Sequence, residues 1–456
     1  MNKNDIIELT IHDLHADGNG VGAFQKNGIA VFVPGGLPGD HLRVKIVKVK
    51  KQYAFGKFLE FLDPSPNRLA ESDTRICPVA GKCGGCQFQH FEYQAQLEFK
   101  EKLVKDALVR IGGFKFGDSL DSPDSLDLAA PLILPIIGMD KPYRYRNKAQ
   151  FPVGPEGLGF YAPRSHRIIP TTDCNIHMHD EIFREVCSVL EKCKIPNLRH
   201  VVIRTGEEAM IIFVLSTSAF PQAEEIKAAF SDKPYTLIVN ENTANTNVIL
   251  GPKFTVIQGS GYIHENIGHI KYRISPRAFF QVNPVQTKVL YDTVASLLNG
   301  GERVIDAYSG IGGIALYIAG KVQEVVGIES VPEAVQDAVY NAGLNDIKNA
   351  RFICGRTEEV LTQEELSQAD CLILDPPRKG CDSRFLETVA ASGVPKIIYV
   401  SCNPATLARD IRQLVSGTNR LVMAQPVDMF PMTGHVETVV LLCRGDTYKS
   451  LNLGTL

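Results

Sequence analysis

The sequence predicts a mixed α/β protein whose carboxyl-terminal part folds as a doubly wound parallel sheet. Three observations predict this class. From about residue 271, short apolar strands alternate with helical segments, which is typical of strand–helix–strand units. The first sixty or so residues instead alternate β-rich runs with glycine turns, as in a small β-barrel. The stretch between them mixes both patterns and favours an α+β domain. We therefore predict three domains, over residues 1–62, 63–270 and 271–456.

Composition limits the class of protein further. A chain of 456 residues is too long for one core, and 44% hydrophobic with 22% charged residues is typical of a soluble protein. It has no apolar run long enough to cross a bilayer, and its amino terminus lacks the pattern of a signal peptide. We therefore predict a cytoplasmic protein without a membrane partner, and a monomer. Cysteines in such a chain stay reduced, so clustered ones indicate metal binding or catalysis.

The amino-terminal barrel, OB-like in its pattern, offers a candidate RNA-binding face. No acidic residue lies between its basic residues in the sequence, and Tyr53 and Phe55 are interleaved with them. They are Arg43, Lys45, Lys48, Lys50, Lys51 and Lys57. A basic and aromatic barrel face suits RNA, whereas an edge strand protected by lysines is the plainer alternative. Because the net charge is −3, RNA binding has to come from such local patches.

The central domain begins after a proline-containing linker at 64–67. A helical pattern over about residues 92–112 follows it and is a candidate to pack on the carboxyl-terminal domain. The acidic segment 117–131 is predicted to be an exposed loop without chemistry. A second group of basic and aromatic residues favours RNA contact over an ordinary solvated surface. It consists of Arg144, Arg146, Lys148, Arg164 and Arg167 with Tyr143, Tyr145 and Tyr161.

Closely spaced cysteines in the same domain predict a metal site. Cys77, Cys83 and Cys86 form a C-x5-C-x2-C pattern, and Cys174 is a candidate fourth ligand. Zinc and an iron–sulfur cluster fit this spacing equally well. Rival ligands, Cys187 and Cys193, lie in a helical apolar pattern and are expected in the core.

The carboxyl-terminal domain carries a predicted ligand pocket. In VIDAYSGIGGIAL a buried strand ends at Asp306, and glycines then allow a ligand to approach the backbone closely. Glu329 closes the next strand, where its carboxylate can bind ribose hydroxyls. This arrangement also describes NAD enzymes. The DPPRKG motif at 375–380, which resembles the substrate-side motif of class I methyltransferases, favours a methyltransferase instead.

Two further residues form a candidate catalytic pair. Cys402 ends the fifth strand before a helix whose free N–H groups and dipole can stabilise a thiolate. A lone cysteine at a strand end is more often a buried hydrophobe, but the turn at Asn403 favours a reactive one. Glu437 opens the last strand, with His435 two residues earlier on the expected same face, and is our candidate base.

Taken together, these residues resemble the RNA 5-methyluridine methyltransferase family, specifically the bacterial 23S ribosomal RNA type. The resemblance covers essentially the whole chain through SPRAFFQVNP, DAYSGIGG, DPPRKG, SCNPATLARD and GHVETV, in that order. The barrel is similar to the TRAM domain of that family. The resemblance implies a class I, Rossmann-like catalytic domain and S-adenosylmethionine as methyl donor. It implies that the donor is bound by Gln281, Tyr308, Glu329 and Asp375.

The same resemblance implies a reaction. Carbon 5 of uracil is a poor nucleophile, so the Cys402 thiolate adds to carbon 6 and Glu437 later removes the proton from carbon 5. The implied substrate is a uridine of 23S rRNA, with a tRNA uridine as the alternative. At the four cysteines the resemblance favours a [4Fe–4S] cluster over zinc. Rival functions are methylation of cytosine, where Arg378 stands in place of the expected cysteine, methylation of an exocyclic amine, and non-catalytic RNA binding.

Overall fold

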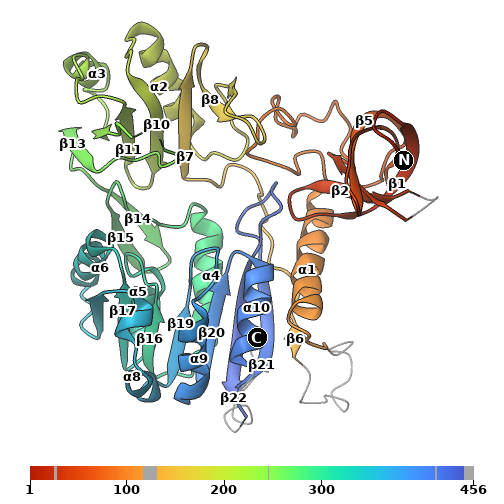
Figure 1. Cartoon of the computed structure of the whole chain (residues 1–456). Coiled ribbons are helices and arrows are strands. Elements are labelled where there is room, and N and C mark those ends of the chain that lie inside the picture. Colours follow the sequence, from red (N-terminus) through yellow and green to blue (C-terminus); the bar gives the residue numbers. More distant parts are fainter. Residues whose placement is uncertain (25–27, 117–130, 245, 416–418, 446–456) are drawn as a thin grey trace.

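The computed structural model describes residues 1–24, 28–116, 131–244, 246–415 and 419–445. Figure 1 shows a small barrel, an upper lobe and a lower lobe. The predicted loop at 117–131 lies outside the described residues except for its last position. Among the helices described, none combines the length and the apolar character that a membrane span requires.

The barrel is closed, with strand order β1-β2-β3-β5-β4. The strands are β1 (Ile6–Leu14), β2 (Asn19–Ala23), β3 (Ala30–Pro34), β4 (His41–Val49) and β5 (Tyr53–Asp63). Alternate residues of β4, namely Leu42, Val44 and Ile46, are fully buried in the barrel core. This period of two is what the alternating sequence predicts, and the barrel is confirmed.

After the barrel, helix α1 (Tyr93–Arg110) runs down the side of the lower lobe (Figure 1). It packs against α10 (Pro404–Leu414) and β21 (Asn419–Val427). Val104 and Leu108 of α1 are fully buried in the lower lobe's core. A helix from the first quarter of the chain therefore completes the carboxyl-terminal unit.

The upper lobe is a seven-stranded sheet of order β13-β12-β11-β10-β7-β8-β9. Its strands are β7 (Lys148–Gly154), β8 (Gly157–Tyr161), β9 (Ile168–Pro170), β10 (Leu198–Thr205), β11 (Ala209–Leu215), β12 (Tyr235–Glu241) and β13 (Lys253–Gln258). Its helices are α2 (Asp180–Lys192) and α3 (Ala223–Ala229). A hairpin of β14 (Ile263–Ile267) and β15 (Ile270–Ile274) follows and leads into the lower lobe (Figure 1).

The lower lobe is an eight-stranded sheet of order β18-β17-β16-β19-β20-β22-β21-β6. Besides β21 it contains β6 (Leu132–Ile133), β16 (Arg303–Ala307), β17 (Glu324–Glu329), β18 (Ala350–Cys354), β19 (Cys371–Leu374), β20 (Lys396–Ser401) and β22 (Glu437–Arg444). The first five strands in this order are parallel, as predicted, but β22 is antiparallel to β20 and to β21. The loop 428–436 is shorter than the roughly dozen residues that a parallel crossover needs, which explains the reversal.

Helices cover both faces of this sheet, which confirms the doubly wound α/β class. Val304 of β16 and Ile373 of β19 face one core, with α4 (Pro284–Ser296), α5 (Gly313–Ile318) and α6 (Pro332–Leu344). Their sequence neighbours Ile305 and Leu372 face the other core, together with α1, α9 (Ser383–Ser392) and α10. Short helices complete the lobe: η1 (Ala319–Lys321), α7 (Thr357–Val360) and α8 (Gln363–Ser367). Strands buried on both faces explain the near-continuous apolar runs of the sequence.

Candidate active site and cysteine site

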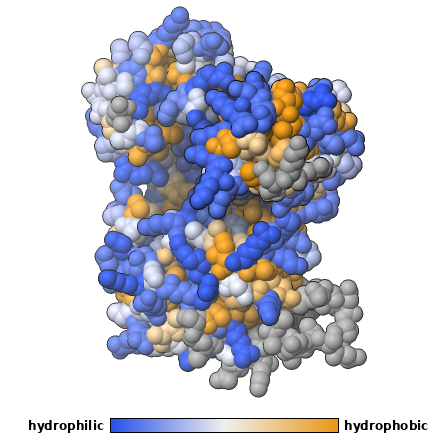
Figure 2. All heavy atoms as spheres, turned by 45° about the vertical axis from the view of Figure 1, so that its right-hand side comes forward, coloured by the Kyte–Doolittle hydropathy of each residue, from blue (hydrophilic) through white to orange (hydrophobic). Residues whose placement is uncertain are grey.

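The carboxyl ends of the parallel strands meet at the edge of the lower lobe that faces the upper lobe (Figure 1). Because the strands are parallel, residues that end successive strands in the sequence come together in space. Asp306, Glu329, Asp375 and Cys402 lie at such ends, and Glu437 begins the antiparallel strand β22 beside them. The face shown in Figure 2 is hollowed between the upper and lower parts of the molecule.

A cavity at this edge is lined by three of the four residues predicted to bind the methyl donor, Gln281, Tyr308 and Asp375. Asp306 lines it as well. Tyr308 adopts a φ of 66°, a left-handed conformation that is costly for a residue with a Cβ. Its hydroxyl donates to Glu358 Oε1 at 2.9 Å, which directs the ring along the cavity wall.

The fourth predicted residue, Glu329, lies beside this cavity at the glycine turn. Its carboxylate accepts hydrogen bonds from the backbone N–H groups of Gly310 at 3.1 Å and Val331 at 2.8 Å. It is only half-buried, and its charge is close enough to raise the pKa of Asp306. The turn between β16 and α5 therefore brings Glu329 next to the cavity lining.

Two carboxyl groups, those of Asp306 and Asp375, line the cavity, and no lysine or arginine is among its lining residues. Burial raises the pKa of Asp306 to about 8, and the nearby Asp375 carboxylate adds to this shift. Asp306 Oδ2 accepts from the Ala315 N–H at 3.0 Å, but Oδ1 is buried without a partner among the described residues. Asp375 is partly accessible from the cavity, yet the surrounding protein raises its pKa to about 7. Such a pair of carboxyls favours a positively charged ligand.

Cys402 lies half-buried next to this carboxyl group. Burial raises the pKa of its thiol to about 11, and Glu437 and Asp375 add to the shift, whereas Arg378 opposes it. The sequence predicts that free N–H groups at the N-terminus of α10 stabilise the thiolate, but two of these groups are already used. Asn403 caps the helix, because its side chain accepts from the N–H groups of Ala405 at 3.0 Å and Thr406 at 3.4 Å.

Glu437 is almost completely buried, with 4% of its surface exposed. Burial raises its pKa to about 8, Asp375 raises it further, and Arg378 lowers it. A carboxyl group with a pKa in this range can accept a proton near neutral pH. His435 is exposed and precedes β22, so it is not part of that strand, contrary to the sequence prediction.

The sequence assigns no role in the site to two arginines that lie near it, Arg378 and Arg204. Arg378, which follows the two prolines, acts electrostatically on Cys402, Glu437 and His435. Arg204 of β10 is 2% exposed and donates to the carbonyls of Ala278 at 2.9 Å and Phe280 at 3.0 Å. It thereby holds the segment that leads to the donor cavity. No local pattern marks it, because its partners are backbone atoms 74 and 76 residues away.

The four predicted ligand cysteines, Cys77, Cys83, Cys86 and Cys174, line one cavity of about 470 Å³. Burial raises the pKa of Cys83, Cys86 and Cys174, and the charges of the other thiolates raise it further. The Gly85 N–H donates to Cys83 Sγ at 3.3 Å, a contact that favours a thiolate. Four cysteines around one cavity supply the sulfur ligands that a zinc ion or an iron–sulfur cluster requires.

The rival cysteines are not part of that cavity. Cys193 is buried in the core of the upper lobe, and Cys187 packs against the same core. Burial raises the thiol pKa of each to about 11. Both therefore serve packing, as the sequence predicts.

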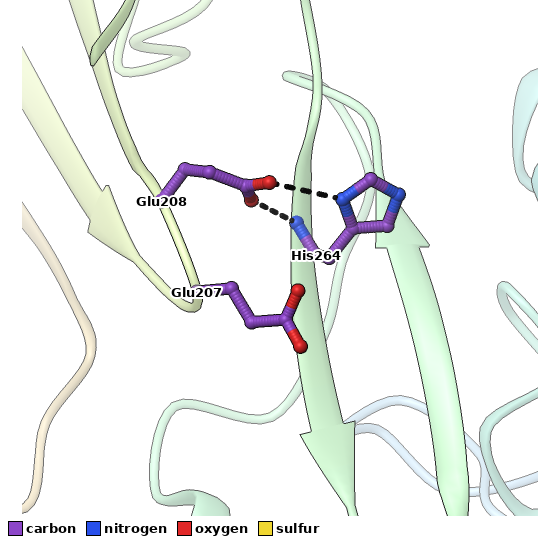
Figure 3. A group of neighbouring side chains, drawn as sticks. All are labelled: Glu207, Glu208 and His264. Carbon is purple, nitrogen blue, oxygen red and sulfur yellow. Dashed lines mark hydrogen bonds and ion pairs between the residues drawn. The ribbon is translucent and has the colours of Figure 1, made fainter. Parts of the chain in front are cut away.

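Another group of potential metal ligands, Glu207, Glu208 and His264, lies where the turn between β10 and β11 meets β14 (Figure 3). Its polar atoms are already used. Glu208 accepts from the His264 N–H at 2.8 Å and contacts His264 Nδ1 at 3.2 Å. Glu207 pairs with Lys271 at 2.6 Å. These bonds account for the group without an ion.

The barrel face differs in part from the predicted basic surface. Arg43 is engaged by Glu8 on β1, at 2.9 Å, and by Glu60 on β5. The five lysines form no ion pair within the part of the chain that the structure describes, and all but Lys45 are exposed. Next to them, Phe32 contacts the rings of both Tyr53 and Phe55. The lysines and these rings retain the chemistry of an RNA surface.

The second basic group is also partly engaged. Tyr145, a predicted stacking residue, is instead 2% exposed, because its hydroxyl donates to the Pro431 carbonyl at 3.0 Å. Arg144 pairs with Asp173 at 3.0 Å, and Arg164 pairs with Asp17 of the barrel at 2.8 Å. Lys148 lines the cysteine cavity, and burial lowers its pKa to about 7.

Comparison with known proteins places this geometry in a family. Residues 222–445 match the family described as tRNA (uracil-5-)-methyltransferase, and residues 2–59 match the TRAM domain. An uncharacterized RNA methyltransferase of Halalkalibacterium halodurans is 44% identical over 467 residues, which cover 97% of this chain and 98% of that protein. One of Clostridium tetani is 40% identical over 465 residues, or 96% of each chain.

A solved structure shows the same fold with a ligand. Pyrococcus abyssi tRNA (uracil-54, C5)-methyltransferase, in complex with S-adenosyl-L-homocysteine, is 27% identical and aligns with a TM-score of 0.75 over 96% of this chain and 100% of that chain. Both the class I fold and the TRAM domain expected from the sequence are thereby confirmed. The chain belongs to the uracil-5 RNA methyltransferase family, whose members depend on S-adenosylmethionine.

Proposed function

We propose that this protein transfers a methyl group from S-adenosylmethionine to carbon 5 of a uridine in 23S rRNA. Cys402 is the covalent nucleophile and Glu437 the general base in this proposal. The main support for this proposal comes from Asp375. It borders the donor cavity, and its charge raises the pKa of both Cys402 and Glu437. The donor, the nucleophile and the base therefore adjoin a single carboxylate.

The reaction balances with these groups. The Cys402 thiolate adds to carbon 6 of the uracil, which forms an S–C6 bond and leaves an enolate at carbon 5. Carbon 5 takes the methyl group, and the bond from that methyl to the sulfonium breaks to release S-adenosylhomocysteine. Glu437 then accepts the proton from carbon 5, the C5–C6 double bond re-forms, and the thiolate leaves. A carboxyl pKa of about 8 suits Glu437 to this step.

The remaining assignments follow the residues around the cavity. Gln281, Tyr308, Glu329 and Asp375 bind the methyl donor, and its cationic sulfonium and ammonium groups match the clustered carboxyls. The four cysteines hold a [4Fe–4S] cluster, with zinc as the alternative, that serves folding and RNA docking. The barrel at residues 1–62 contributes RNA affinity.

Replacement of the proposed nucleophile tests the mechanism. We expect Cys402→Ala to lose all detectable methyl transfer while it binds S-adenosylmethionine as the wild type does. Cys354→Ala, at another strand end but exposed, is the matched control and keeps full activity. Activity in Cys402→Ala would refute covalent catalysis and favour a direct methylation of an exocyclic amine.

The base requires a separate experiment. With Glu437→Gln the methylated adduct forms, but its carbon 5 proton stays in place, so a covalent protein–RNA species accumulates. A slowly migrating gel band that disappears in Glu437→Gln combined with Cys402→Ala is the expected result. A Glu437→Gln protein that turns over at the wild-type rate would exclude this residue as the base.

The RNA substrate has a second candidate, a tRNA uridine, because the solved Pyrococcus abyssi relative is a tRNA (uracil-54, C5)-methyltransferase. Cells that lack this protein distinguish the two. We expect 5-methyluridine to disappear from a position in 23S rRNA and to remain in tRNA. The opposite pattern would transfer the proposal to tRNA without changing the chemistry.

A further inference from the structure

The loop 428–436, between β21 and β22, leads directly into the proposed base Glu437. It rises from the lower lobe toward the barrel, beside the upper end of α1 (Figure 1). Met432 within it has a φ of 65° although it is not glycine, and it is 1% exposed. A buried residue in this conformation persists only where its surroundings hold it.

The surroundings do so by hydrogen bonds from outside the loop to five consecutive carbonyls. The donors, in order from residue 428 to 432, are Gln286, Asn283, Lys100, Tyr145, and the backbone N–H groups of Gln87 and Phe88. The Met432 N–H in turn donates to Gln96 Oε1 at 3.0 Å. Hydrogen bonds from outside the loop therefore fix its backbone from residue 428 to residue 432.

One ion pair anchors the beginning of the loop. Lys100 Nζ of α1 donates to Asp428 Oδ1 at 2.5 Å, and both side chains are fully buried. The same ammonium reaches the Phe430 carbonyl at 3.0 Å. The Tyr93 hydroxyl donates to the other carboxylate oxygen of Asp428 at 2.8 Å and accepts from the Met139 N–H at 2.8 Å.

A buried ion pair is a poor source of net stability, because desolvation of both charges offsets their attraction. The ion pair instead fixes geometry, since each buried charge has to stay next to its partner. The pair joins a helix near the barrel to the loop that ends at Glu437. Misplacement of a reacting group by about 1 Å can cost on the order of a hundredfold in rate.

We infer that Lys100 and Tyr93 are positioning residues for the general base: through Asp428 they fix the loop 428–436 and so aim the Glu437 carboxylate at carbon 5 of the bound uracil. This inference rests on the proposed function, in which Glu437 removes the carbon 5 proton. Neither residue is among those that line the donor cavity. They therefore act on the last step of the reaction and not on donor binding or on the addition of the thiolate.

The test compares Lys100→Met and Tyr93→Phe with Lys102→Met. Lys102 lies on the same helix but is exposed, and it pairs with Asp13 and Asp106, so it is a matched control. In the two positioning variants we expect turnover to fall about tenfold to a hundredfold, with unchanged affinity for S-adenosylmethionine. We also expect the covalent protein–RNA species to accumulate. RNA carrying deuterium at carbon 5 should show an isotope effect on turnover that the wild type lacks.

Each outcome bears on the inference. Reduced turnover without adduct and without an isotope effect means that the pair is merely structural, and this overturns the inference. If Lys100→Met fails to fold, Tyr93→Phe, which removes one hydroxyl, carries the test alone. If Glu437→Gln accumulates adduct but the positioning variants do not, only the inference fails. If Glu437→Gln turns over normally, the proposed base fails and the inference fails with it.

Discussion

The carboxyl groups of the donor cavity predict that binding of S-adenosylmethionine depends on pH. The free protein holds Asp375 with a pKa of about 7 and Asp306 with a pKa of about 8. A cationic ligand favours their ionised forms, so it lowers both pKa values when it binds. Binding below these values therefore releases protons, and the affinity for the donor rises as the pH rises.

The size of the effect follows from the ionised fraction of the free protein. With a pKa of about 7, roughly one tenth of Asp375 is ionised at pH 6 and roughly nine tenths at pH 8. Since the apparent dissociation constant is the intrinsic one divided by the competent fraction, it falls roughly tenfold over this interval. Asp306 acts in the same direction, but because neighbouring carboxyls titrate as a pair, we take tenfold as the minimum.

Calorimetric titration measures both quantities. Titrations in two buffers with different heats of ionisation give the number of protons released, and Kd is followed from pH 6 to 8. Asp375→Asn should retain only the titrations of Asp306 and of the ligand's own amino group, whose usual pKa is about 8. Asp346→Asn, on the open surface, is the control and should behave as the wild type does. A wild-type Kd that is constant over this range, with no proton release, would refute the reasoning.

Three further predictions follow from the site. Arg378→Met removes the cation that lowers the pKa of Cys402, so kcat/KM at pH 7 should fall about tenfold and recover in part at pH 9, as a pH–rate profile can measure. Arg204→Met leaves two loop carbonyls unpaired, so urea unfolding should show a loss of about 1–3 kcal/mol, and donor titrations should show weaker binding. Cys86→Ser should lose bound metal and any cluster absorbance, whereas Cys187→Ser should retain them. Metal retained in the former would contradict the four-cysteine site.

The sequence alone predicts the parts of the site that depend on local pattern. A run of apolar residues that ends in a polar one predicts a buried strand and its functional end, and Asp306, Asp375 and Cys402 follow this rule. Parallel strands then bring such ends together without further information. The position of Glu437 at the start of β22 has the same origin.

What the sequence misses depends on contacts between distant segments. Tyr145 has the sequence context of a surface aromatic residue, but it is buried, and its hydroxyl donates to a carbonyl 286 residues away. Arg43 lies in a basic run, yet neighbouring strands provide the carboxylates that engage it. At Cys402 the sequence offers free N–H groups at the helix start, but the Asn403 side chain accepts from two of them, and burial together with carboxyl groups from other strands raises the pKa of the thiol.

The same long-range contacts predict that residues 271–456 do not fold alone, although the sequence marks them as a domain. The core on one face of the sheet contains Val104 and Leu108 of α1, which such a fragment lacks. The loop 428–436 would lose four of its six carbonyl donors, Lys100, Tyr145, Gln87 and Phe88, and Asp428 would remain buried without its cation.

A buried charge without its partner costs about 3–5 kcal/mol, which is a large share of the 5–15 kcal/mol that stabilises a typical domain. We therefore expect the fragment 271–456 to lack a cooperative urea transition in circular dichroism, whereas the full chain shows one. A fragment that begins at residue 91 restores α1 and should recover the transition. Cooperative unfolding of residues 271–456 at the midpoint of the full chain would contradict this account. The barrel and the catalytic sheet are on this view joined through α1, so the helix that follows the RNA-binding domain also builds the active site.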